Sequence, residues 1–377
     1  MKRKTLKIAV GVAAAAGVGA VLLPSTFANA GEARNTVDKA TAASFGRIAD
    51  DVITQRSAVL VDGNRQGSRI ETNEKKVRLS SRWERNEEDG LSSLRTRKKR
   101  LNSLGEAYTG AETRVTTDST SVKGGRATVV VTEVTVYHYK QLRGDEPRTT
   151  GFTAHHELNF HRVSGGKWEL ADMKPLDDGP RAINQPQKTP AATPDKGGPL
   201  KATPASIDWP ARSVPKSQKP GGYDYKAMAA YAEKYWRNYN PQYRDYNGQG
   251  GDCTNFISQA LKAGGWKDEA GSASDSRKWW SNSKADSTSW VGVNEWSTFA
   301  MTSKRATSLA NVYQMDVGDI LQMDFEGDGS KDHSMIVTYR SRLGIPYVTY
   351  HSTNTFRKSV ASIIAANPDS VYFAYRT

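Results

Sequence analysis

The pattern of hydrophobic and polar positions changes near residue 110, within the first half of the sequence. Charged segments at 36–55 and 79–104 have the composition of helices, and after residue 110 the chain becomes rich in β-branched and aromatic residues. That texture is typical of strands, and we expect glycine pairs at 124–125 and 165–166 to form hairpin turns. The predicted strands are 113–120, 126–141, 152–163 and 167–175. Residues 31–176 are therefore expected to form an N-terminal α+β domain.

A second predicted domain, residues 223–377, follows a polar segment. Residues 177–222 hold nine of the fifteen prolines together with Gly, Lys, Ser and Thr, so we expect an extended linker. Beyond it, 223–239 carries aromatic and apolar residues at helical spacing and predicts an amphipathic helix. Residues 253–263 predict a further helix, and the domain is long enough for one hydrophobic core.

The first thirty residues have the pattern of a signal peptide. Four basic residues precede an apolar run at 8–23, and Ala28-Asn29-Ala30 has the small-residue form that signal peptidases cut. An uncleaved anchor is the alternative, since about 16 apolar residues approach the length of a short membrane span. We expect cleavage after Ala30, secretion to the cell wall and no stable membrane span after processing.

The net charge favours an anionic partner. The formal charge is +13, and the four basic residues of the predicted signal peptide leave +9 for the rest. An anionic cell-wall polymer or an acidic substrate would fit this surplus. The sequence shows neither a phosphate-binding loop nor a basic stripe interleaved with aromatic residues, so we expect no nucleic-acid partner.

Metal-binding patterns are weak. His155, His156 and His161 lie on one predicted strand, where neighbours point to opposite faces, and no Cys, Asp or Glu stands at ligand spacing. The stretch 324–329 begins like a calcium loop, but Met335 stands where the bidentate glutamate is expected, which favours an acidic turn. We therefore expect no metal and no cofactor.

Cys253 is the only cysteine, which excludes an intramolecular disulfide, an iron–sulfur cluster and a multi-thiolate zinc site. It begins the predicted helix 253–263, with Asp252 as the N-cap residue. Backbone N–H groups and the helix dipole at this end favour a thiolate and can lower a thiol pKa. A small buried hydrophobe is the alternative interpretation. The predicted secretion, the preceding Gly-Gly-Asp loop and the downstream histidines favour a nucleophile.

Two histidines of the second domain are candidate partners of Cys253. His333 and His351 lie on predicted strands at 333–339 and 347–351, around a turn at 342–344. A hairpin centred on residue 342 would make them direct cross-strand partners. Any register in which the numbers of paired residues add up to an even number would leave both on one face of the sheet. We predict that His333 takes the thiol proton and that His351 orients His333 through its other ring nitrogen. Asn354 is the reserve candidate for that orienting role, and Asp252 and Asn354 are candidate binding residues.

Four tryptophans of this domain admit two interpretations. They could line a groove and stack on a sugar or peptide, or they could fill the core, and we favour the core. They are Trp279, Trp280, Trp290 and Trp296.

Several motifs carry a resemblance to a known family. They are Gly251–Gln259 with Ala263-Gly264-Gly265, and the segments 317–323, 332–338 and 350–355. Together they resemble the putative amidase domain of Gram-positive secreted proteins, a family similar to the papain-like NlpC and CHAP cell-wall hydrolases. This resemblance implies a helix packed on an antiparallel sheet, with Cys253 as nucleophile, His333 as base and His351 as third member. The hairpin at 160–170 of the first domain resembles cystatin-like or nuclear-transport-factor-2-like domains.

The resemblance also implies a reaction. A Cys253 thiolate would attack an amide carbon, the Cys253 N–H and a polar neighbour would stabilise the oxyanion, and a thioester would then be hydrolysed. We expect a secreted cysteine-dependent amide hydrolase that cleaves peptidoglycan amide bonds. The alternatives are a cysteine peptidase or acyltransferase that acts on proteins, and a catalytically silent surface-binding protein.

Overall fold

The computed structural model describes residues 37–63, 76–140, 144–186, 202–214, 216, 222–249 and 251–377. The predicted signal peptide, residues 1–30, lies outside the described residues. Within these ranges, no helix combines the length and the apolar character that crossing a membrane requires.

The described residues of the first part of the chain form two long helices and five strands. Helix α1 (Lys39–Val59) is capped by Asp38, and α2 (Ser81–Ser103) is capped by Ser80, each through a side-chain oxygen that accepts a backbone N–H. The strands are β1 (Val77–Leu79), β2 (Tyr108–Lys123), β3 (Arg126–Tyr139), β4 (Thr149–Arg162) and β5 (Trp168–Pro175). Gly124 and Gly125 join β2 to β3 with positive φ angles of 56° and 78°, which confirms the predicted hairpin turn.

The second part begins with α3 (Tyr225–Tyr235) and α4 (Cys253–Ala263), and α4 has the predicted bounds. The elements that follow are α5 (Thr288–Val291), α6 (Val293–Thr302), β6 (Thr307–Leu309), β7 (Ile320–Asp324), β8 (His333–Arg340), β9 (Pro346–Tyr350), β10 (Thr355–Ser359), α7 (Val360–Ala366) and β11 (Val371–Arg376). Short 3₁₀ turns lie at Ser164–Gly166 and Val312–Gln314.

The strands of both parts form one sheet. Among the described residues its order is β1-β5-β4-β10-β9-β8-β7-β11-β6, and β3 pairs with both β4 and β2. Only the β1–β5 pair in this set is parallel. The predicted α+β class is therefore confirmed at this level, while the papain-like and cystatin-like architectures stay predictions.

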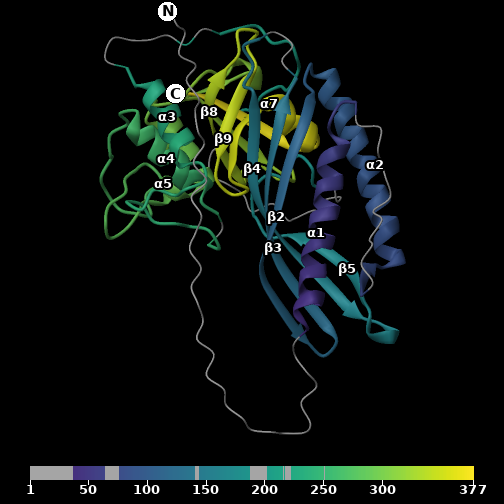
Figure 1. The fold of residues 1–377 in the computed structure, drawn as a ribbon. Coiled ribbons are helices and arrows are strands. Elements are labelled where there is room, and N and C mark those ends of the chain that lie inside the picture. The colour runs from purple at the N-terminus through teal and green to yellow at the C-terminus, as the bar shows by residue number, and fades with distance from the viewer. Residues whose placement is uncertain are drawn as a thin grey trace, which may run out of the picture.

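Strand β4 joins the two parts (Figure 1). One edge of β4 pairs with β3 along its length; the other pairs with β5 at 156–162 and with β10 at Gly151 and Phe152. The Thr150 hydroxyl adds a 2.9 Å hydrogen bond to the carbonyl of Phe356. Helices α1 and α2 lie on the far side of the molecule from α3, α4 and α5, with the strands between them (Figure 1). The predicted boundaries 31–176 and 223–377 thus enclose parts that share a sheet.

Three clusters of buried residues fill the core. One lies between α1 and strands β3–β5, and a second lies between α4, α6 and strands β7, β8 and β11. The third draws residues from α2, β2 and β3 of the first part and from β9 and α7 of the second. Trp279, Trp290 and Trp296 are fully buried in the second cluster, so the predicted core role is confirmed for them, whereas Trp280 is half-buried.

Residues 182–185 are packed against the folded parts, whereas an extended linker was expected from the composition of 177–222. Ala182, Ile183 and Asn184 are 1–2% exposed. The guanidinium of Arg97 donates to the carbonyls of Ile183 and Gln185, both at 2.6 Å. The composition argument failed here because a few apolar and polar residues find buried partners on the folded parts.

Candidate active site

Cys253 is the first residue of α4, and its side chain is buried, with 4% of its surface exposed. The Ser334 backbone N–H, in β8, donates to the thiol, and the Thr254 hydroxyl lies 3.7 Å from the sulfur. Thr254 also contacts the Ser334 hydroxyl at 3.0 Å. The predicted position of the thiol at the amino end of a helix is confirmed, and the thiol lies against the strand that begins with His333.

The thiol pKa shifts opposite to the sequence expectation. Burial raises the pKa of Cys253, because the low-polarity surroundings penalise the thiolate, and the Ser334 N–H and the Thr254 hydroxyl oppose this only in part. The neighbouring Asp252 carboxylate raises it further. The expected lowering by the helix end is therefore wrong for this structure, since burial outweighs it.

His333 is the first residue of β8 and is 1% exposed. Its Nε2 atom has no hydrogen-bond partner, and its ring lies edge-on to Tyr350 with 5.1 Å between the centroids. Burial lowers the His333 pKa to about 3, and the positive charges of Lys358 and His351 lower it further. The imidazole is therefore neutral at pH 7, with one nitrogen able to accept a proton.

The strand geometry relates the imidazole to the thiol. Met335 and Val337 of β8 face the core cluster shared with α7, whereas Ile336 faces the cluster that contains α4. Because side chains alternate between the two faces of a strand, His333 lies on the same face as Met335 and Val337. A backbone N–H of a strand lies in the plane of the sheet, so the thiol that accepts from Ser334 lies near that plane beside His333. Within the described residues no hydrogen bond joins Cys253 to His333.

His351 is bound to other groups than those predicted. Its Nδ1 lies 2.6 Å from an Asp252 carboxylate oxygen, and its Nε2 lies 2.8 Å from the carbonyl oxygen of Tyr235. Both partners are acceptor atoms, so neither ring nitrogen of His351 is left to contact His333. Tyr239 and Phe256 stack on its two faces with centroids at 3.9 Å. The predicted contact in which His351 orients His333 is therefore not formed.

The register of the hairpin explains this difference. Near the turn β8 and β9 pair with an even sum, as in Tyr339↔Tyr347, but a bulge between Val337 and Tyr339 changes the pairing to Val337↔Val348. On the His333 side of the bulge, the numbers of two paired residues add up to an odd number, so His333 cannot lie opposite His351. The predicted direct pairing of these two histidines is therefore wrong. One inserted residue moves a side chain to the other face.

The two candidate binding residues fix the surroundings of His351. Asp252 makes no side-chain cap to α4; instead its carboxylate accepts from the Tyr246 N–H at 3.0 Å and the Asn255 amide at 2.8 Å. The amide oxygen of Asn354 accepts from the Tyr239 hydroxyl at 2.9 Å. Tyr235 and Tyr239 lie within the predicted amphipathic helix 223–239, and nothing in that pattern identified their contacts with His351.

The loop after β9 is conformationally strained. Ser352 and Thr353 have positive φ angles of 59° and 65°, which residues other than glycine rarely adopt. The Ser352 hydroxyl accepts from the Asp252 N–H at 3.2 Å, and Gly251, with φ 100°, lies directly against it. A methyl group at Gly179 would come within 1.9 Å of the Ser352 carbonyl oxygen. The Asp252–Cys253 corner is therefore held by backbone as well as by side chains.

The acidic stretch after β7 forms a turn, as predicted. The Asp324 carboxylate accepts from the N–H groups of Gly327, Asp328 and Gly329 at 2.6–3.2 Å. Asp332 accepts from the Phe325 N–H, and burial, together with nearby carboxylates, raises its pKa to about 6. Carboxylate oxygens of Asp324, Glu326 and Asp332 lie within 4.8 Å of one another.

Comparison with known families confirms the resemblance given by the motifs. Residues 222–375 match the model of the family described as putative amidase domain. The description of this family suggests an amide hydrolase at the level of the family.

Two curated proteins of Bacillus subtilis (strain 168), both described as uncharacterized, are similar to the chain. YhbB is 35% identical over 136 residues, which cover 34% of this chain and 42% of YhbB. YjcM is 32% identical over 143 residues, covering 35% of this chain and 32% of YjcM. The chain thus spans less than half the length of these relatives.

A solved structure, the intermembrane space region of chloroplast protein ARC6, is similar at 19% identity over 35% of this chain and 95% of that one. Its TM-score is 0.22, which carries no argument about the fold.

Proposed function

We propose that the chain is a secreted, cysteine-dependent amide hydrolase that acts on peptidoglycan in the cell wall. Cys253 is the nucleophile and His333 is the base. One observation carries this proposal: the thiol at the start of α4 accepts from the backbone N–H of Ser334, the residue after His333, and the imidazole Nε2 of His333 has no hydrogen-bond partner. Nucleophile and base are thus supplied by a helix end and an adjacent strand.

The two pKa shifts bear on how the thiol is activated. Burial raises the pKa of Cys253 and lowers that of His333, so a resting thiolate–imidazolium pair is disfavoured. Proton transfer to His333 would therefore accompany attack on the amide carbon instead of preceding it. The imidazole then protonates the leaving amine, and water hydrolyses the thioester.

Helix α4 supplies oxyanion stabilisation in this proposal. Its first N–H groups have no intrahelical acceptor, because the first bond of the helix is donated by Phe256 to the carbonyl of Asp252. The N–H of Cys253 is the donor nearest to a carbonyl under attack by its own sulfur. His351 acts as a positioning residue, since it holds Asp252, the residue next to the nucleophile.

The test uses purified wall sacculi and casein as parallel substrates, with products analysed by mass spectrometry. Release of muropeptides by the native protein and not by Cys253→Ala supports the proposal. Cleavage of casein without muropeptide release would assign the same residues to a peptidase. The absence of both products with folded protein would overturn catalysis and favour the surface-binding alternative.

Histidine variants divide the roles further. We expect His333→Ala to abolish turnover and His351→Ala to leave a residual rate, since a positioning group is only partly required. His138→Ala is the matched control, because the His138 side chain is 43% exposed and pairs at the surface with the Glu112 carboxylate. Equal and complete loss in both site variants would contradict the ranking.

A further inference from the structure

Three buried side chains connect strand β7 to the thiol of Cys253. Gln322 of β7 and Ser334 of β8 are direct cross-strand partners, and both, like Thr254 of α4, are 0% exposed. The amide nitrogen of Gln322 lies 3.1 Å from the Ser334 hydroxyl oxygen, which lies 3.0 Å from the hydroxyl oxygen of Thr254. The Thr254 oxygen in turn lies 3.7 Å from the Cys253 sulfur. Among the described residues, neither hydroxyl has another hydrogen-bond partner.

The amide of Gln322 determines the direction of these hydrogen bonds. Its Nε2 atom lies 2.9 Å from the carbonyl oxygen of Val293, which can only accept, so a nitrogen must face it and not the amide oxygen. An amide nitrogen only donates, so the Ser334 oxygen accepts from Gln322. The hydrogen of Ser334 is therefore left for the Thr254 oxygen. The hydrogen of Thr254 then points at the sulfur of Cys253.

The sulfur is thus the acceptor at the end of a directed chain. It also accepts from two backbone N–H groups, those of Ser334 and Thr254. Hydrogen bonds donated to a group that can lose a proton favour its charged form. We propose that the Thr254 hydroxyl stabilises the Cys253 thiolate as a hydrogen-bond donor, and that Ser334 and Gln322 are positioning residues that fix its direction. This inference rests on the proposed role of Cys253 as nucleophile.

Two substitutions of Thr254 test the donor. The rate of iodoacetamide labelling, followed by adduct mass, is measured against pH. Thr254→Val keeps the shape and removes the hydroxyl, so it should raise the midpoint by about one pH unit. Thr254→Ser keeps the hydroxyl and should label like the native protein, with melting temperature as the check on folding. A native midpoint in Thr254→Val, or equal shifts in both variants, would overturn the proposal.

Gln322→Glu tests the direction of the chain. A carboxyl at this position can only accept from Ser334, whether it is ionised or gives its one hydrogen to the Val293 carbonyl. Ser334 then donates to the carboxyl, Thr254 donates to Ser334, and the sulfur loses a donor. The labelling midpoint should rise by about one pH unit, as in Thr254→Val. An unchanged midpoint in folded Gln322→Glu would overturn the directed chain.

The double variant Gln322→Glu/Ser334→Ala separates direction from charge. Without the Ser334 hydroxyl the new carboxyl has no connection to Thr254, so the midpoint should return to that of Ser334→Ala alone. A shift that persists in the double variant would assign the effect to the charge of the carboxyl and overturn the directed chain.

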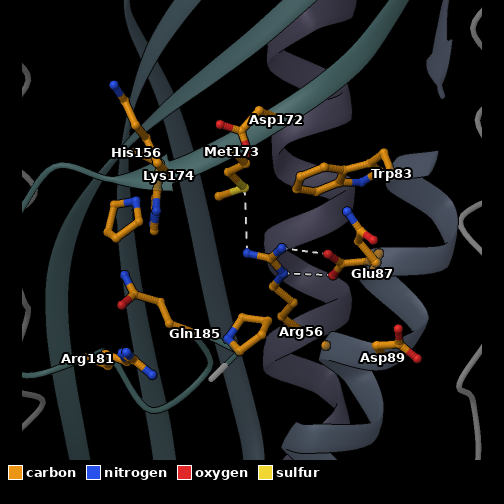
Figure 2. Close-up of a pocket in the computed structure, with 14 residues that line it drawn as sticks. Arg56, Trp83, Glu87, Asp89, His156, Asp172, Met173, Lys174, Arg181 and Gln185 are labelled. Carbon is orange, nitrogen blue, oxygen red and sulfur yellow. Dashed lines mark hydrogen bonds and ion pairs between the residues drawn. The ribbon is translucent and has the colours of Figure 1, made fainter. Parts of the chain in front are cut away.

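Gln185→Glu is the matched control for a new buried carboxyl. Gln185 is 8% exposed and lines a cavity of about 410 Å³ between α1, α2 and β5, away from α4 (Figure 2). This variant should keep the native midpoint, and a shift equal to that of Gln322→Glu would contradict the proposal. The midpoint is measured without substrate. Expected shifts in a protein that releases no muropeptides would therefore refute the proposed function and leave the thiolate contact standing.

Discussion

Burial shifts the pKa values of Cys253 and His333, the two residues that would exchange a proton, in opposite directions. The Cys253 thiol and the His333 imidazole are both enclosed, and the enclosure keeps each in its neutral form. A neutral pair is stable against oxidation and chance alkylation, which protects the single thiol of this chain. Reactivity then depends on what the arrival of a substrate does to the surroundings of the sulfur.

Thiol labelling tests this at Cys253. We expect iodoacetamide to react slowly with the native protein, with an apparent pKa above the ordinary thiol value of about 8.5. Because the chain has one cysteine, adduct mass reports this site alone. Protein unfolded in urea should label at the ordinary rate, and Cys253→Ala should not label. A native midpoint well below about 8.5 would contradict the burial argument.

His333 gives stability a pH dependence. The unfolded imidazole, with a pKa of about 6.5, binds a proton before the folded one, whose pKa is about 3. The contribution is therefore complete above pH 6.5 and is lost as pH falls toward 3, by up to about 1.4 kcal/mol per pH unit.

Urea denaturation at pH 7 and pH 4.5 measures this effect as a difference between native protein and His333→Asn. We expect the variant to lose less stability on acidification. Equal losses would show that His333 is not held neutral. The comparison is made by difference because burial raises the pKa of Glu106 to about 7 and lowers that of Lys358 to about 7.

Among the elements, α3, α4 and the end of β9 are joined by the Asp252–His351 pair. Both side chains are at most 1% exposed. Removing one partner of a buried pair leaves an uncompensated group, at a cost of about 3–5 kcal/mol. We expect this loss for His351→Leu and for Asp252→Asn, measured by urea denaturation. The double variant should lose less than the sum, and additive losses would argue against a direct pair.

The sequence predicted several elements because their signals are local. Helix α4 has its predicted bounds, set by an apolar face and Gly264, and the β2–β3 hairpin follows from Gly124 and Gly125. The placement of Cys253 was predictable for the same reason. The partner of His351 was not, because it depends on a bulge near Thr338 and on aromatic contacts from α3. No residue pattern in the hairpin marks that bulge.

At the scale of the whole molecule, the predicted parts share a sheet and a core cluster. The β4–β10 contact joins residues far apart in sequence, 206 positions for Thr150 and Phe356. Alternation along a strand predicts which face is buried but not which strand lies beside it, so the sequence could not predict this junction. The packing of residues 182–185 escaped prediction for a similar reason, since its partners lie on α2 and β3.

Calorimetry tests how strongly the two parts are coupled. Because β10 completes an edge of β4 and one cluster spans both parts, we expect a single cooperative unfolding transition. The van't Hoff and calorimetric enthalpies should then agree. Two resolved transitions, or an enthalpy ratio well below one, would show that the parts unfold independently.

One edge of β4 pairs with both β5 and β10, and this arrangement suggests where the chain could be divided. A cut placed between residues 186 and 202 would separate the backbone without removing any β4–β10 hydrogen bond or any member of the shared cluster. Two co-expressed fragments should therefore assemble by complementation, and co-purification through a tag on one fragment would reveal it. If the assembled fragments recover activity, that activity would measure how well the two fragments pair through β4 and β10.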